Sequence, residues 1–474
     1  MKPLVSMRAA LTDDDLLGQA LQGESWAAWR TLLIAMLGEE LTDDERVIFK
    51  ALTGRDSEPL QLIEEFWGVI GRRGGKTRAM AVLAAYLAGL VDHSDVLALG
   101  ERGVLPILAA TTKQAATAFG YVDAFFERLP FLAELVANRT ASTLDLTNGV
   151  SIDVKPANFR TVRSITAIGA IADEIAFWRV SDESVNPDTE ILNALRPALA
   201  TTGGPLVCIS SPHARRGELY ATHKAHFGPD GDPLILVAHG ASRTLNPSLS
   251  QRIVDRAMER DPAAAAAEYL GEFRSDIESL LTVEAVAAVT IGGRFELPPM
   301  TGFHYFGFVD PSGGSADSMT LAVAHTLDGA AVLDAVREVR PPFSPDGVTE
   351  EFAALLKRYR IARVHGDRYA GEWPRERFRT YGIAYEPADR TASEFYLEML
   401  PLINSGRVEL LDLPRLSGQL VALERRTSRT GRDLISHPPG GHDDIANSVA
   451  GVLSLAARKP PTPAHYVRIN WMER

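Results

Sequence analysis

Three stretches of the sequence carry residues whose types and spacing suit phosphate chemistry. In the first, Val69-Ile-Gly-Arg-Arg-Gly-Gly-Lys-Thr77, glycines, a lysine and a threonine follow a short apolar run. Glycines let backbone N–H groups curl around phosphates at a helix N-terminus, Lys76 can reach the terminal phosphates, and the Thr77 hydroxyl can hold Mg²⁺. We therefore predict a nucleotide-binding loop over residues 71–77, comprising Gly71, Arg72, Arg73, Gly74, Gly75, Lys76 and Thr77.

This loop departs from the general pattern G-x-x-x-x-G-K-[ST]. Counted back from Gly75, the first glycine position holds Ile70, and Gly71 is displaced by one residue. Gly-Lys-Thr alone also occurs in strand-to-helix turns that bind nothing, so the prediction depends on a second half of the site.

The second stretch, Ile168-Gly-Ala-Ile-Ala-Asp173-Glu174, is an apolar strand that ends in two acids. An acid at a strand end can bind Mg²⁺ through water, and its neighbour can polarise the attacking water. We assign Asp173 to the metal and Glu174 to the base. The alternative is a solvated acidic start of a helix.

A third apolar run, Leu206-Val-Cys-Ile-Ser-Ser-Pro212, ends in small hydroxyl residues. In a parallel sheet this end lies beside a bound nucleotide, where Ser210 and Ser211, followed by Pro212, can sense the γ-phosphate. An ordinary strand end is the other interpretation. An arginine could also neutralise transition-state charge, and the sequence does not choose among Arg72, Arg73, Arg163, Arg215 and Arg216.

A different set of acids follows residue 300. Asp310 ends the first predicted strand, FGFVD, and Asp367 ends the fourth, ARVHGD. Asp443 and Asp444 open the last long predicted helix, in GGHDDIANSVAG. In a ribonuclease H-like fold the first and fourth strands are adjacent and the final helix packs across them, so these acids would converge. Convergent carboxylates repel one another, and two Mg²⁺ or Mn²⁺ ions would offset that repulsion and activate water against a phosphodiester.

Three further residues near these acids could serve as ligands. Asp317, seven residues after Asp310, is either an auxiliary ligand or a turn carboxylate. Asp443 and Asp444 project about 100° apart on a helix, and we favour Asp443 as the primary ligand without excluding Asp444. His442 could also ligate, although hard oxygen sites do not need it.

The segment ERRTSRTGR is a predicted loop or hairpin that gathers positive charge in an acidic protein. Arg425, Arg426, Arg429 and Arg432 are candidates for contacts with a DNA backbone. The alternative is a solvated loop.

The elements that must position these residues alternate between short apolar runs and helices. From about residue 60 to 249 the pattern predicts a mostly parallel α/β sheet covered by helices. Residues 1–59 are predicted to be a helical extension, 250–299 a helical linker or lid, 300–457 a second α/β domain, and 458–474 a flexible tail.

Composition limits the class of protein. The 474 residues can fill two or three domains, and the single cysteine, Cys208, excludes an intrachain disulfide and a cysteine-rich zinc site. The formal net charge of −12 argues against a surface that coats nucleic acid indiscriminately. The apolar stretches are too short to span a bilayer and no secretory segment opens the chain, so we expect no membrane contact and a cytosolic location.

Together, the loop GRRGGKT, the Asp-Glu pair, the strand end SSP and the terminal HDDIANSVAG resemble the large terminase subunit of tailed bacteriophages. The resemblance implies a P-loop ATPase domain of the RecA/ASCE type followed by a ribonuclease H-like nuclease domain. Residues 71–77 would be Walker A, Asp173 and Glu174 Walker B, residues 210–212 the coupling motif, and Asp310, Asp367 and Asp443 nuclease ligands. An adenine-contacting glutamine is also implied, with Gln61 as its candidate.

The resemblance also implies a cofactor and partner set. These are ATP with Mg²⁺, two nuclease ions, double-stranded DNA, a portal protein, a small terminase subunit and a homo-oligomeric ring on the portal. The subunit would act in the host bacterial cytoplasm, transiently attached to the procapsid and absent from the mature virion. The competing interpretations are an ATP-dependent repair or restriction nuclease, and a prophage assembly protein whose nuclease is inactive.

Overall fold

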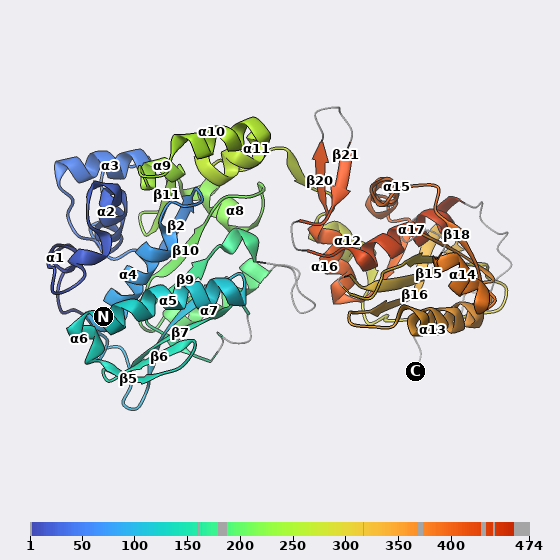
Figure 1. Cartoon of the computed structure of the whole chain (residues 1–474), viewed down its shortest axis with the longest axis horizontal. Helices are drawn as coiled ribbons and strands as arrows, with labels where there is room; N and C mark the ends of the chain where they lie inside the picture. Colours follow the sequence, from blue (N-terminus) through green and yellow to red (C-terminus); the bar gives the residue numbers. More distant parts are fainter. Residues whose placement is uncertain are drawn as a thin grey trace. The chain divides into compact units, whose positions relative to one another are not determined.

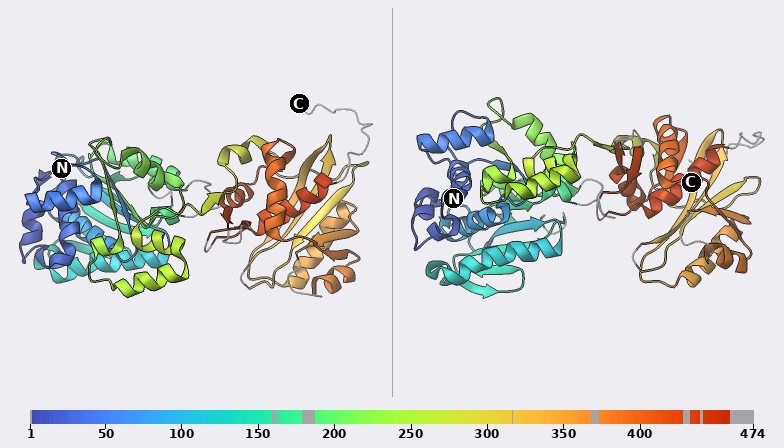
Figure 2. Two further views of the ribbon diagram at one scale, coloured as in Figure 1. Left: turned by 90° about the horizontal axis from the view of Figure 1, so that it is seen from above. Right: turned by 45° about the horizontal axis from the view of Figure 1, so that its top comes forward.

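The computed structural model describes residues 2–158, 162, 164–178, 187–315, 317–367, 373–427, 433–438 and 441–458. They form two compact units (Figure 1; Figure 2). The described residues up to Asp276 make unit 1 and those from Ile277 make unit 2, so the chain passes between units inside the predicted 250–299 linker. No described helix is both long and apolar enough to cross a membrane.

Unit 1 is built on a mostly parallel sheet, as the alternating pattern predicts. Its strand order is β11-β2-β10-β9-β4-β7-β6-β5, and all pairs from β11 to β7 are parallel, whereas β6 and β5 are antiparallel. Parallel strands covered on both faces are apolar throughout, and every residue of β10 is buried. The strands are β2 (Glu65–Ile70), β4 (Gly103–Ala109), β5 (Val136–Arg139), β6 (Thr143–Leu146), β7 (Val150–Pro156), β9 (Ala170–Asp173), β10 (Leu206–Ser210) and β11 (Ile235–Gly240).

The order of these strands brings the three predicted segments together. The loop after β2, the acids after β9 and the serines after β10 all leave the carboxyl edge of the sheet, with β10 lying between β2 and β9. The helices that cover the sheet are α4 (Lys76–Gly89), α5 (Thr112–Arg128), α7 (Pro187–Leu199) and α8 (Gly217–His226). Helix α5 stops at Arg128, because Pro130 cannot continue it and instead starts the short α6 (Pro130–Ala133).

The N-terminal residues, predicted as an extension, share one hydrophobic core with α4 and the central strands. They form α1 (Met7–Thr12), two 3-10 turns, η1 (Gly18–Leu21) and η2 (Glu24–Trp26), then α2 (Ala27–Met36) and α3 (Asp43–Thr53). Thr42 and Glu45 make a capping box that fixes the start of α3. Because Trp29, Leu32 and Leu33 are fully buried, α2 is an integral part of the core of unit 1.

The residues after β11 also belong to unit 1. They form α9 (Ser242–Leu245), α10 (Gln251–Arg260), α11 (Pro262–Ala265) and a π-helical turn, η5 (Ala266–Leu270), which ends at Gly271. Gly271 adopts φ of +79°, a conformation that favours glycine. This segment returns the chain to the loop that follows β2.

Unit 2 has the predicted ribonuclease H-like arrangement. Its sheet order is β13-β19-β16-β15-β14-β17-β18, with β14, β15 and β16 antiparallel and β17 parallel to both β14 and β18. The predicted adjacency of the first and fourth strands, β14 and β17, is confirmed. The strands are β13 (Thr290–Ile291), β14 (Tyr305–Asp310), β15 (Met319–Leu327), β16 (Ala330–Val339), β17 (Arg363–Gly366), β18 (Ala384–Pro387) and β19 (Val408–Leu411).

Helices cover both faces of this sheet and create two cores. One core gathers α12 (Val283–Val289), α15 (Ala392–Asn404), α16 (Pro414–Ala422) and α17 (Asp444–Arg458), and the other gathers α13 (Pro345–Arg358) and α14 (Trp373–Thr380). Helix α17 lies close to β14 because Gly451 has no side chain: a Cβ there would come 2.5 Å from the Phe308 ring. A hairpin of β20 (Glu424–Thr427) and β21 (Asp433–Ser436) pairs with β12 (Ile277–Ser279).

Candidate active sites

Lys76 reaches from the start of α4 across the carboxyl edge of the sheet in unit 1. Its Nζ donates to the Ile70 carbonyl at 3.0 Å and to Ser211 Oγ at 2.8 Å, and lies 3.4 Å from Glu174 Oε1. The side chain is only 6% exposed, so the ammonium is held inside the site by these partners. The structure thus brings together one residue from each of the three predicted segments.

Glu174 is held rigidly beside the lysine. Its backbone adopts φ of +52°, and its Oε2 accepts from Ser210 Oγ and from the Ser211 backbone N–H, both at 3.1 Å. Ser210 and Ser211 therefore orient the predicted base and contact Lys76 as well. Pro212, the last residue of the predicted coupling motif, is buried directly after them.

The surroundings of Asp173 fit the role of a metal ligand. The residue is 6% exposed, and its Oδ1 has no hydrogen-bond partner among the described residues. Burial and the adjacent Glu174 raise the pKa of Asp173 to about 7, although Lys76 opposes the shift. Thr77 and Asp173 line the same small cavity. A buried carboxylate oxygen without a partner is the donor chemistry that Mg²⁺ prefers.

The displaced glycine of the loop has a packing explanation. A Cβ on Gly71 would come 2.5 Å from Ser242 Oγ and 2.8 Å from Ser242 N, so only glycine fits there. Ile70, which occupies the standard glycine position, is a fully buried end of β2. Gly75 and Arg73 take positive φ values of 84° and 67°, which form the turn into α4.

Side chains remote in sequence hold the backbone of this loop. Trp29 Nε1 donates to the Gly74 carbonyl at 2.6 Å, Ser242 Oγ to the Arg72 carbonyl at 2.6 Å, and Asn246 Nδ2 to the Arg73 carbonyl at 2.9 Å. Sequence reasoning missed all three, because no local pattern relates residues 29, 242 and 246 to the loop. The three loop carbonyls that accept these hydrogen bonds therefore point toward side chains outside the loop.

The arginines considered for neutralising transition-state charge have different environments. Arg72 pairs with Glu268 at 3.0 Å on the surface, while Arg73 and Arg215 are exposed. Arg216 precedes α8 as its N-cap residue, and Arg163 lies outside the described residues. The structure selects none of them as a finger.

Gln61 does not lie beside the loop. Its backbone packs against Gly38, just past the C-terminal end of α2, and its side chain is exposed. The loop contacts Trp29 and Trp26 instead, at the other end of α2, and ten helical residues span about 15 Å. The candidate adenine contact at Gln61 is therefore not brought to the site.

In unit 2, Asp310 and Asp367 meet at the ends of the adjacent strands β14 and β17. Asn447, one turn into α17, links them: its Nδ2 lies 2.9 Å from Asp310 Oδ2 and 3.5 Å from Asp367 Oδ2. Desolvation raises the pKa of Asp310 well above its usual range, the nearby Asp367, Asp444 and Asp443 raise it further, and the Asn447 hydrogen bond opposes the shift. Asn447 is a site residue that sequence reasoning missed, although its position three residues after Asp444 places it on the same helix face.

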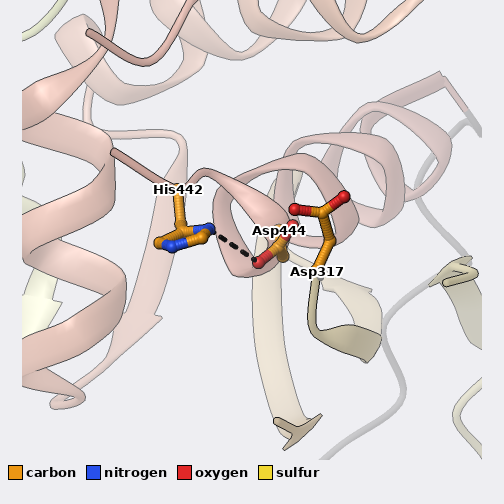
Figure 3. Close-up of side chains that lie close together, drawn as sticks. All are labelled: Asp317, His442 and Asp444. Carbon is orange, nitrogen blue, oxygen red and sulfur yellow. Dashed lines mark ion pairs between the residues drawn. The ribbon is translucent and has the colours of Figure 1, made fainter. Parts of the chain in front are cut away.

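Asp444, rather than Asp443, lies with Asp317. Figure 3 shows Asp317, His442 and Asp444 together, and one ligand atom of each falls within 4.8 Å of the others. Asp444 is 9% exposed, and its Oδ2 has no hydrogen-bond partner. Burial raises the pKa of Asp444, with Asp443 and Asp317 adding to the shift and His442 opposing it. This donor set fits a divalent cation.

Asp443 has a different environment. Tyr396 Oη donates to Asp443 Oδ2 at 3.0 Å, and the Asp443 carbonyl accepts from the Asn447 backbone N–H at 2.7 Å as the first bond of α17. Asp443 thus serves as the backbone cap of the helix, and Thr320 Oγ1 anchors the next residue by donating to the Asp444 carbonyl at 2.7 Å. The preference for Asp443 over Asp444 stays a prediction, and the geometry favours the neighbour.

The described arginines of the hairpin have acidic partners within it. Arg425 pairs with Asp433 on the opposite strand, and Arg426 with Glu424 at 2.9 Å. Arg429 and Arg432 lie outside the described residues. The hairpin itself, one of the two predicted forms of this segment, is confirmed.

No family model and no curated protein matches the chain. Among solved structures, the large terminase of bacteriophage HK97 is similar at 16% identity and a TM-score of 0.38, covering 92% of this chain and 100% of that one. The large terminase of a thermophilic bacteriophage matches at 11% identity and a TM-score of 0.38, covering 83% of this chain and 94% of that one. The large terminase nuclease of the thermophilic phage G20c matches at 18% identity and a TM-score of 0.33, covering 37% of this chain and 97% of that one.

Proposed function

We propose that this chain is the large subunit of a phage terminase, which hydrolyses ATP to translocate double-stranded DNA and cleaves that DNA at a separate site. One observation carries the proposal: two acid-lined sites of different chemistry occur in one chain, Lys76 with Glu174 and Asp173 in unit 1, and Asp310, Asp367 and Asp444 in unit 2. The first suits a nucleoside triphosphate and the second a phosphodiester.

In unit 1, Lys76 binds the terminal phosphates and exchanges its contact with Glu174 for them. The freed Glu174 carboxylate accepts a proton from the attacking water, while Ser210 and Ser211 keep it oriented. Thr77 and Asp173 would hold Mg²⁺, which supplies charge neutralisation on the phosphates. Because Ser211 contacts both Lys76 and Glu174, loss of the γ-phosphate changes its hydrogen bonds directly.

In unit 2, Asp310, Asp367, Asp444 and Asp317 would hold Mg²⁺ or Mn²⁺, with Asp443 or His442 as further ligands. Bound ions, two in our proposal, supply water activation and stabilisation of the leaving oxygen. Asn447 orients the carboxylates of Asp310 and Asp367 toward one point. The hairpin arginines Arg425, Arg426, Arg429 and Arg432 are proposed to contact the DNA backbone.

The wider setting belongs to the same proposal. The subunit would form a homo-oligomeric ring on a portal protein in the host cytoplasm, receive DNA with a small terminase subunit, and leave before the virion matures. It would cut concatemeric DNA at the start and end of packaging.

The test measures both activities in one preparation. Purified protein is incubated with supercoiled plasmid and Mg²⁺, Mn²⁺ or EDTA, and ATP turnover is followed with and without DNA. We expect Lys76→Ala and Glu174→Gln to lose about 100-fold or more of the ATP turnover while retaining Mn²⁺-dependent nicking. Asp310→Ala and Asp367→Ala should show the reverse.

Two results would contradict this assignment. If Lys76→Ala folds normally yet loses nicking together with ATP turnover, the activities do not reside in separate sites. Undiminished cleavage by Asp310→Ala and Asp367→Ala would remove the nuclease site.

A further inference from the structure

Trp26 lies against the outer side of the phosphate-binding loop. A Cβ placed on Gly75 would come 2.8 Å from Trp26 Cζ3 and 3.0 Å from Cη2, so the edge of the indole touches the turn just before Lys76. Trp29, three residues later, is fully buried and bonded to the loop, whereas Trp26 is only partly buried. Trp26 therefore keeps part of its surface available to a ligand.

Arg78 lies over one face of this indole. Its guanidinium carbon lies 5.1 Å from the centroid of the Trp26 ring, within the range of a cation–π contact. Guanidinium and indole planes both accept a stacked nucleobase. The pair comes from two elements, the end of η2 and the first turn of α4, so the segment before α2 contributes to the surroundings of the loop.

The contacts of Lys76 indicate the direction that a bound phosphate chain would take. Lys76 points toward Ser211 and Glu174, so the terminal phosphate lies on the β9 and β10 side of the loop. Successive helical residues project about 100° apart, so Arg78 projects about 200° away from Lys76. A nucleoside attached at the opposite end of the phosphate chain leaves the loop on the side of Arg78 and Trp26.

We propose that Trp26, backed by Arg78, is the stacking platform for the nucleobase of the bound nucleotide. The inference rests on the proposed ATP hydrolysis and adds the residue that recognises the base. Trp26 takes the place that the sequence suggested for Gln61, because the loop meets the N-terminal end of α2 and Gln61 lies at its other end.

The experiment compares two ligands that differ by the adenosine group. Binding of Mg²⁺-ADP and Mg²⁺-pyrophosphate to the full chain is measured by titration calorimetry. Trp26→Ala should weaken ADP binding by about tenfold, the loss of one base–aromatic stack, and leave pyrophosphate affinity unchanged. Trp26→Phe retains an aromatic plane and should recover most of the ADP affinity.

Trp29→Phe is the matched control. It removes the hydrogen bond to the Gly74 carbonyl without removing an exposed ring, so it should weaken ADP and pyrophosphate by the same factor. Equal weakening of both ligands by Trp26→Ala, or no effect on ADP, would overturn the platform while leaving the nucleotide site in place. If the unaltered chain binds neither ligand, the proposed ATP hydrolysis itself fails.

Discussion

At the scale of residues, each site depends on a neutral side chain that holds charged ones in place. In unit 1, Ser210 and Ser211 orient Glu174, and in unit 2, Asn447 spans Asp310 and Asp367. Such residues take no part in proton transfer or metal charge balance, so composition and charge pattern do not reveal them. Their effect is measured by removing them while the groups that they orient stay in place.

Asn447→Ala provides a test at this scale. Losing the amide removes the donor that bridges the two carboxylates, so we expect the free energy of unfolding of unit 2 in EDTA to fall by about 1–3 kcal/mol. Added Mg²⁺ or Mn²⁺ should restore part of this loss, because cations offset the repulsion. Denaturant unfolding with and without the ion measures both effects.

Ser448→Ala is the control on the same helix, since its hydroxyl donates only locally to the Ile445 carbonyl at 3.0 Å. Its effect on stability should not depend on divalent ions. If the cost of Asn447→Ala is equally insensitive to them, Asn447 is a packing residue and does not organise the metal site.

At the scale of elements, α8 and β11 are joined through a pair of histidines. His239 Nε2 lies 2.7 Å from the Gly271 carbonyl, which can only accept, so this nitrogen carries the proton. His239 Nδ1 must then accept, and His223 Nε2 donates to it at 3.1 Å. Burial, followed by the neighbouring His239, lowers the pKa of His223 to about 4, and burial also lowers the pKa of His239. Gly240, next to His239, accepts from the Gly71 N–H at 3.0 Å, so this junction supports the loop.

This junction predicts a pH dependence of stability. A histidine whose folded pKa is depressed costs nothing while it is neutral in both states. As pH falls below about 6.5, the unfolded chain takes up the proton first, so stability is lost progressively toward pH 4. His223→Phe should be less stable than the unaltered chain at pH 7, because His239 Nδ1 loses its donor, yet its stability should decline less between pH 6.5 and 4.

Unfolding of unit 1 is followed by denaturant titration at each pH for the two proteins. His239 and the carboxylates that titrate in the same window are common to both, so the difference between the curves isolates the contribution of His223. Parallel curves across this range would contradict the lowered pKa of His223.

At the scale of the whole molecule, the two units carry separate cores and separate sites. Ligands should therefore stabilise one unit at a time. At a constant concentration of free Mg²⁺, ADP at about 100 times its Kd should add about 2.7 kcal/mol to the unfolding free energy of unit 1 and leave that of unit 2 unchanged. Calorimetry of the full chain measures this, with Lys76→Ala as the variant that should lose the response. A shift of all transitions together would mean that the units unfold as one.

The sequence by itself determined which residues suited to phosphate chemistry are present and their order along the chain. Gly-Lys-Thr after an apolar run, acids at strand ends and the order of strands after residue 300 are local signals, and they predicted the parallel sheet and the adjacency of β14 and β17. The tertiary structure alone decided the partners. Trp29, Ser242 and Asn246 reach the loop from 45, 170 and 173 residues away, and the surroundings of Asp443 and Asp444 depend on Tyr396 and Asp317. Such contacts leave no periodicity in the sequence, because packing between distant elements, rather than local backbone preference, brings these groups together.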